Sequence, residues 1–127
     1  MHSNHLFEYA VIRIVPRVER EEFLNAGIVL YCRDLHFLDT VYHIDKNKLA
    51  AFCVEDCMIE LEKNLIAFSS IASGENKNSP IARLDIASRF RWLTATRSTM
   101  LQASKVHPGL CSDAAATLQR LFRELVL

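Results

Sequence analysis

Residues 7–15, FEYAVIRIV, carry apolar side chains at nearly every position. Neighbouring side chains of a β-strand point to opposite faces of the sheet. One face of this segment would hold Phe7, Tyr9, Val11 and Val15, and the other would hold Ala10, Ile12 and Ile14. The pattern predicts a strand covered on both sides, which ends at Pro16 because proline has no N–H to donate.

Three more segments have the composition of strands. AGIVLYCR (26–33) and LHFLDTVYHI (35–44) flank a tight turn at Arg33 and Asp34, which predicts an antiparallel hairpin continuing a three-strand meander. STMLQASKV (98–106) predicts a fourth strand. Since Gln102, Ser104 and Lys105 could not all be buried without partners, one end of that strand should lie at a rim.

The remaining apolar positions recur at helical spacing. Asp45 can cap a short helix through residues 46–52, and a longer helix should begin at Glu55 or Asp56 and stop at Gly74. Its apolar stripe is Met58, Leu61, Leu65, Phe68 and Ala72. A third helix should begin at Pro80 and bury Ile86, Phe90 and Leu93. Pro108 and Gly109 should then turn the chain into a last helix, with Ser112 as N-cap, Asp113 in its first turn, and Leu118, Leu121, Phe122 and Leu125 on one face.

These elements predict an α+β fold, in which residues 1–127 form one domain with an antiparallel sheet of about four strands and helices packed on it. Half of the residues are hydrophobic and 24% are charged, so the domain can fold without a metal or disulfide. The longest apolar run, residues 26–32, is too short to span a membrane. We expect a cytosolic protein, since its start does not resemble a signal peptide, and we expect no cofactor.

The charges are segregated although the formal net charge is zero. Residues 1–82 hold 8 basic and 12 acidic side chains, whereas residues 83–111 hold 5 basic and 1 acidic. Zero net charge argues against wholesale nucleic-acid binding. The basic segment nevertheless predicts a binding edge over residues 89–107.

Four blocks, YAVIRIVP (9–16), EFLNAG (22–27), RWLTATRST (91–99) and Q.S.VHPGLC (102–111), resemble the bacterial family catalogued as domain of unknown function 3037. The resemblance runs from Tyr9 to the last helix. It implies no activity, cofactor or catalytic residue. Members of this family are encoded beside kinases resembling the HipA-type persistence toxin. The resemblance therefore implies an accessory or regulatory module that binds a protein partner, which is our leading hypothesis.

The candidate ligand-binding residues of the basic edge are Arg97, Ser98, Thr99, Gln102 and His107. The guanidinium and hydroxyl groups at 97–99 suit a carboxylate or phosphate. Alternatively, Arg97 caps the preceding helix and the hydroxyls satisfy a turn. The second hypothesis is a binder of nucleic acid or a phosphorylated ligand, with Trp92 stacking on a base, against the alternative that Trp92 lies in the core.

A second candidate group is Arg13, Glu22 and Asn25. Arg13 falls on an otherwise apolar strand face and needs a partner, because an unpaired buried charge is costly. A structural ion pair with Glu22 is one interpretation, and an anion pocket shared with Arg97 is the other. Asn25 tolerates a left-handed turn, and Gly27 allows a bulge.

The third hypothesis is a small enzyme that uses His107 and Cys111. His107 would be a general acid or base working with Glu22, or would activate Cys111, whose place before a helix could lower its pKa. A zinc site of Cys53, Cys57, His107 and Cys111 can also be written down, but the spacing is not that of a zinc finger. The alternative is that the cysteines are buried thiols, and we predict no metal.

Overall fold

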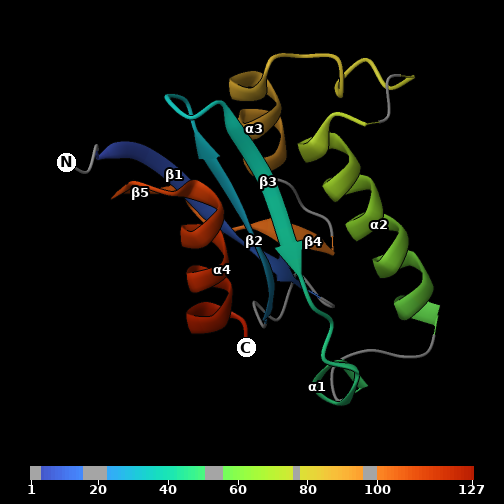
Figure 1. The fold of residues 1–127 in the computed structure, drawn as a ribbon. Coiled ribbons are helices and arrows are strands. Elements are labelled where there is room, and N and C mark those ends of the chain that lie inside the picture. The colour runs from blue at the N-terminus through green and yellow to red at the C-terminus, as the bar shows by residue number, and fades with distance from the viewer. Residues whose placement is uncertain (1–3, 16–22, 51–55, 76–77, 96–99) are drawn as a thin grey trace.

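A five-stranded antiparallel sheet forms the centre of the protein (Figure 1). The structure is a computed structural model that describes residues 4–15, 23–50, 56–75, 78–95 and 100–127. The strands follow the order β3-β2-β1-β4, and β5 also pairs with β1. Their bounds are β1 His5–Ile14, β2 Leu24–Cys32, β3 Phe37–Tyr42, β4 Leu101–Ala103 and β5 His107–Cys111.

Helices cover both faces of the sheet, which confirms the α+β class. Helices α2 and α3 lie on one face and α4 on the other, while the short α1 follows β3 (Figure 1). Their bounds are α1 Lys46–Ala50, α2 Asp56–Ser73, α3 Ile86–Thr94 and α4 Ala114–Leu125. None of these helices is both long and apolar enough to cross a membrane, within the residues that the structure describes.

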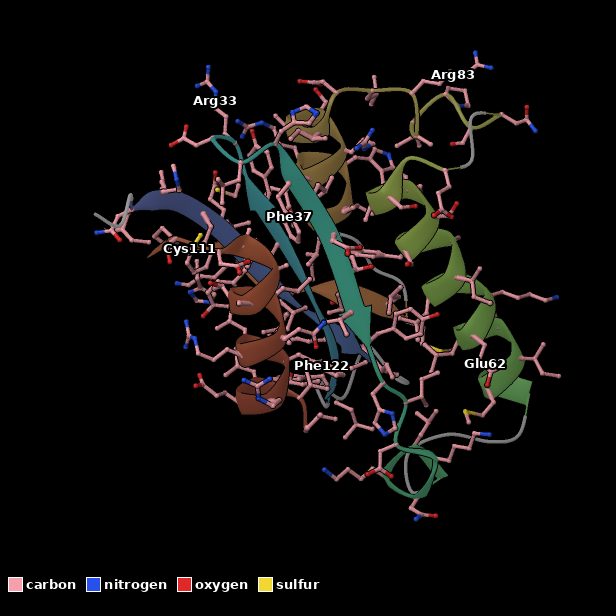
Figure 2. The ribbon with its side chains drawn as sticks, viewed as in Figure 1. Arg33, Phe37, Glu62, Arg83, Cys111 and Phe122 are labelled. Atoms are coloured by element: carbon pink, nitrogen blue, oxygen red, sulfur yellow. The ribbon has the colours of Figure 1, made fainter. Side chains whose placement is uncertain are left out.

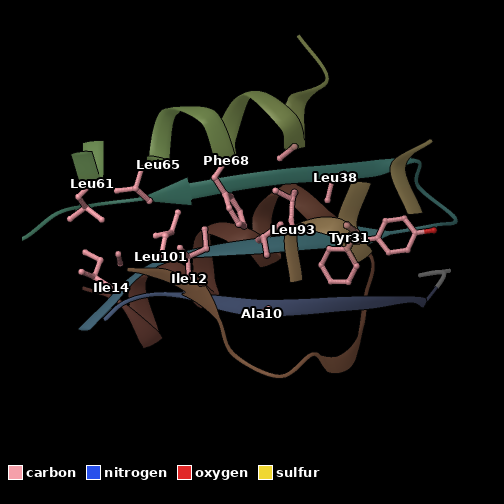
Figure 3. Close-up of a cluster of buried hydrophobic side chains, with 14 of the residues drawn as sticks. Ala10, Ile12, Ile14, Tyr31, Leu38, Leu61, Leu65, Phe68, Leu93 and Leu101 are labelled. Carbon is pink, nitrogen blue, oxygen red and sulfur yellow. The ribbon is translucent and has the colours of Figure 1, made fainter. Parts of the chain in front are cut away.

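Each face of the sheet has its own hydrophobic core, as the two apolar faces of the first strand predict. Ala10, Ile12 and Ile14 of β1 pack with the predicted stripe of α2 and with Phe90 and Leu93 of α3 (Figure 3). Phe7 and Val11 pack instead with Leu118 and Leu121 of α4. β1 is therefore the strand on which both cores depend.

The predicted meander is confirmed, with a longer turn than expected. β1 pairs with β2, and β2 with β3, all antiparallel. The turn between β2 and β3 spans Arg33–His36, and His36 adopts a left-handed φ of 49°. The register of β1 and β2 shifts between Ile12 and Arg13 where β2 reaches Gly27, as predicted for a bulge there.

β4 and β5 share one edge of β1. β4 pairs with Ile12–Ile14, and β5 pairs with His5–Tyr9. Ser104 joins the two strands: it is 4% exposed, its N–H donates to the Val11 carbonyl at 2.8 Å, and its hydroxyl accepts from the Val11 N–H at 2.8 Å. The predicted fourth strand is therefore shorter than 98–106, because the chain leaves the ladder at Ser104.

The prediction that Pro108 and Gly109 turn the chain is wrong, because both belong to β5. Pro108 faces Glu8, and Gly109 faces Phe7. Proline is tolerated because β5 is an edge strand, with no strand on its outer side among the described residues. Gly109 is needed because a Cβ at this position would lie 2.5 Å from Phe7 Cζ.

Most predicted helix signals act where expected. The Asp45 carboxylate accepts from the N–H groups of Asn47 and Lys48, each at 3.1 Å, and Gly74 ends α2 with a φ of 74°. Two helix starts were placed wrongly. α3 begins at Ile86, after a series of turns from Pro80, and the N-cap of α4 is Asp113, not Ser112.

The N-cap assignment predicts different effects for two adjacent substitutions. Asp113 Oδ1 accepts from the Ala116 N–H at 3.1 Å, so Asp113→Ala should lower the free energy of unfolding by about 1 kcal/mol. Ser112→Ala is the matched control and should change it by less than about 0.5 kcal/mol. Urea unfolding followed by circular dichroism measures both, and equal effects would contradict the assignment.

Candidate functional site

A surface cleft of about 770 Å³ lies where β1 begins, β2 ends and α3 begins. Its size is within the range of small-ligand pockets. We call it the arginine cleft, and its lining residues are Leu6, Glu8, Tyr31, Arg33, Asp34, His36, Asp85, Ile86, Ala87, Arg89 and Arg91. Tyr31 is buried and its ring stacks on Phe90 at 5.3 Å, so one side of the cleft rests on the core. The fold therefore joins three segments far apart in sequence.

Arg33 and Arg91 supply the accessible positive charge of the cleft. Both are exposed, and neither has an ion-pair partner within the described part of the chain. Arg33 points away from the body of the protein at the tip of the β2–β3 turn (Figure 2). A guanidinium presents several donors in one plane, so each can bind a carboxylate or phosphate through two hydrogen bonds.

Arg89 has a structural role. Its Nη1 donates to the carbonyl oxygens of Ala82 at 3.4 Å and Leu84 at 3.1 Å. The same nitrogen would be 2.9 Å from a Cβ placed on Gly74. Arg89 thus connects α3 to the turns that precede it and to the end of α2. Its Nε is buried and has no hydrogen-bond partner among the described residues.

Two of the three carboxylates in the cleft have partners. Asp34 lies 3.3 Å from the His5 ring. A hydrogen bond with Ser88 lowers the pKa of the Asp85 carboxyl, and nearby Arg89 acts in the same direction. Glu8 is half-buried. Arg33 and Arg91 thus share the cleft with two carboxylates, Asp34 and Asp85, that already interact with other residues.

The structure brings together three predicted site residues in one row of the sheet. Arg13 of β1 faces Asn25 of β2 on one side and Gln102 of β4 on the other. The Arg13 guanidinium lies 4.2 Å from the centre of the Phe23 ring, a cation–π contact that the sequence analysis missed. Asn25 donates through Nδ2 to the Leu125 carbonyl at 3.1 Å, which satisfies a free carbonyl at the end of α4.

Four other predicted site residues, Glu22, Arg97, Ser98 and Thr99, lie outside the described residues. Both interpretations of Arg13, the ion pair with Glu22 and the anion pocket with Arg97, therefore stay predictions. Arg13 nevertheless has an aromatic neighbour, Phe23, among the described residues. Its Nε is buried and lacks a hydrogen-bond partner in the described segments.

The described ends of the predicted basic edge lie on opposite faces of the sheet. Arg89 and Arg91 belong to α3, which packs on the face of Ala10, whereas the His107 ring lies 5.3 Å from the Tyr9 ring on the α4 face. Residues 89–107 therefore do not present one continuous surface at these two ends. Arg89 and Arg91, which were predicted to belong to one basic edge, instead line the cleft together with Arg33 of the β2–β3 turn.

The structure does not support a lowered pKa for Cys111. Burial raises the pKa of this thiol, and the neighbouring Cys32 raises it further, while Thr117 acts in the opposite direction. Cys111 lies beside the start of α4 in the second core (Figure 2). His107 and Cys111 are four residues apart on one strand, hence about 13 Å apart, so His107 does not activate the thiol.

The same separation prevents His107 and Cys111 from sharing one metal ion. Cys53 lies outside the described residues, and the side chain of Cys57 is likewise not described. Across the described ranges, no three His, Cys, Asp or Glu side chains are grouped to hold a metal.

The protein is an α+β domain, with a sheet covered on both faces and a polar cleft at one end. The chain belongs to the family described as "Protein of unknown function (DUF3037)", whose profile matches residues 9–126. This confirms the resemblance found in the four sequence blocks. Searches of curated proteins and of solved structures found no match.

The buried state of Cys111 predicts low thiol reactivity. Because its pKa is raised, less thiolate is present at pH 8 than for an exposed cysteine, and alkylation by iodoacetamide should be at least tenfold slower in the native protein than in urea. Peptide mass spectrometry measures Cys111 separately from the other cysteines. Equally fast labelling in the native and unfolded protein would contradict this placement.

Proposed function

We propose that the protein is a non-enzymatic accessory or regulatory module that binds an acidic segment of a protein partner in the arginine cleft. The observation that carries this proposal is the pair of exposed guanidinium groups, Arg33 and Arg91, at one cleft. Carboxylate side chains of the partner would bind these two groups. Tyr31 and Leu6 would contact an apolar side chain between them.

Exposed leucines around the cleft favour a protein as the ligand. Leu6 lines the cleft and is 57% exposed, and its cross-strand partner Leu110 is 66% exposed. Leu35 and Leu84 are also exposed, and each is adjacent in sequence to a lining residue. Arginine beside exposed apolar groups is typical of protein interfaces rather than of phosphate sites.

The partner we propose is a HipA-like kinase encoded nearby, as the family resemblance implies, with both proteins in the cytosol. Nucleic acid or a phosphorylated ligand is the less favoured class, because a phosphate group would make no use of the exposed leucines around the cleft. The enzymatic hypothesis is also less favoured, because His107 and Cys111 lie about 13 Å apart on one strand.

Removing both accessible guanidinium groups should abolish the complex. We expect the wild-type protein to co-elute in size-exclusion chromatography with the co-expressed neighbouring kinase at micromolar concentration, and Arg33→Glu/Arg91→Glu to elute separately. Repulsion between the new carboxylates and an acidic segment should weaken binding by at least about a hundredfold.

Arg123→Glu is the matched control, since Arg123 is an exposed arginine on α4, on the opposite face of the sheet. It should leave co-elution unchanged. Absence of a wild-type complex would overturn the choice of partner, and co-elution of the double variant would overturn the cleft. If a fluorescein-labelled single-stranded oligonucleotide bound through Arg33 and Arg91 with steep salt dependence, the nucleic-acid hypothesis would replace ours.

A further inference from the structure

Two isoleucines are exposed on the outward side of α2. Ile59 is 64% exposed and Ile66 is 62% exposed. Leu61, Leu65 and Phe68, which α2 contributes to the core, are at most 6% exposed and lie on the opposite side of the helix. α2 therefore has two apolar faces, and the chain covers only one of them in the part that the structure describes.

Ile59 and Ile66 lie almost directly above one another. They are seven residues apart, which is nearly two turns of a helix, so their side chains form one short stripe about 10 Å long. Glu62 and Lys63 occupy the space between them, and both are exposed. Neither charge has an ion-pair partner in the described ranges.

The order of these four residues is symmetric. The midpoint between positions 59 and 66 is also the midpoint between positions 62 and 63. If a second α2 approaches in the antiparallel direction across a twofold axis at this midpoint, Ile59 of each copy meets Ile66 of the other. Glu62 of each copy then meets Lys63 of the other, so the stripe is its own complement in shape and in charge.

We propose that this outward face of α2, formed by Ile59, Glu62, Lys63 and Ile66, is a homodimer interface whose occupant is α2 of a second copy of the chain. Charge complementarity selects this occupant, because a twofold axis midway between positions 62 and 63 places Glu62 of each copy opposite Lys63 of the other. A hollow of about 310 Å³ continues the surface toward the edge strand, where Tyr42, His43 and Ile44 adjoin Glu62 and Ile66. Glu62 can be found on α2 in Figure 2.

One helix pair buries less surface than a stable dimer of standard size. The dissociation constant of the dimer should therefore lie in the range of about 10–500 μM. This inference rests on α2 alone and does not depend on the proposed function.

Sedimentation equilibrium from 5 μM to about 1 mM tests the interface. Ile66→Asp should raise the dissociation constant of the wild-type dimer at least about tenfold, because each dimer loses two apolar contacts. Leu127→Asp is the matched control: Leu127 is 67% exposed and follows α4, so this variant should keep the dissociation constant of the wild-type dimer. Circular dichroism checks that both variants keep the fold.

A charge exchange makes the test specific to the antiparallel register. Glu62→Lys and Lys63→Glu should each weaken association about tenfold, since like charges then meet across the axis. The double variant Glu62→Lys/Lys63→Glu restores opposite charges and should associate like the wild type. A wild-type protein that is monomeric at every concentration, or a double variant as weak as its single parents, would overturn the proposal.

Discussion

The hydrogen bonds between Ser104 and Val11 are the contact on which the rest of the sheet depends. β1 is buried on both faces, so every N–H and C=O along it needs a partner within the protein. β4 and β5 together provide these partners on one edge, and Ser104 bridges the break between them by accepting the Val11 N–H and donating to the Lys105 carbonyl at 2.9 Å. Without this hydroxyl, a buried donor would be left unpaired.

The position of the arginine cleft follows from how the strands meet at that break. β5 pairs with the first half of β1. In this half, Leu6 and Glu8 lie on the sheet face that α3 covers only in part. The β2–β3 hairpin ends at the same level, and the turns before α3, fastened by Arg89, complete the rim. The positions of Arg33 and Arg91 thus depend on a strand pairing that lies at least 16 residues away from either.

Local patterns in the sequence determine most of the elements but not the long-range pairings. The alternation in β1, the stripe of α2 and the signals at Asp45 and Gly74 each depend on neighbouring residues, so they could be predicted. β5 could not, because Pro108 and Gly109 resemble a turn until Phe7, about a hundred residues earlier, is known to lie over Gly109. Ser112 and Asp113 are both good N-caps, so propensity alone does not choose between them.

The candidate site was less predictable, because it depends on burial and on contacts between distant segments. A position before α4 suggested a reactive Cys111, whereas desolvation in the second core raises the pKa of its thiol. Arg13 was expected to need an acidic or anionic partner, and the nearby aromatic ring of Phe23 was missed. The proposed surface on α2 is separate from the cleft: Ile66 lies about 12 Å along the helix from Gly74, beside which the Arg89 guanidinium rests. Dimerisation through α2 and partner binding in the cleft would therefore use different side chains, so substitutions at either surface test the two proposals separately.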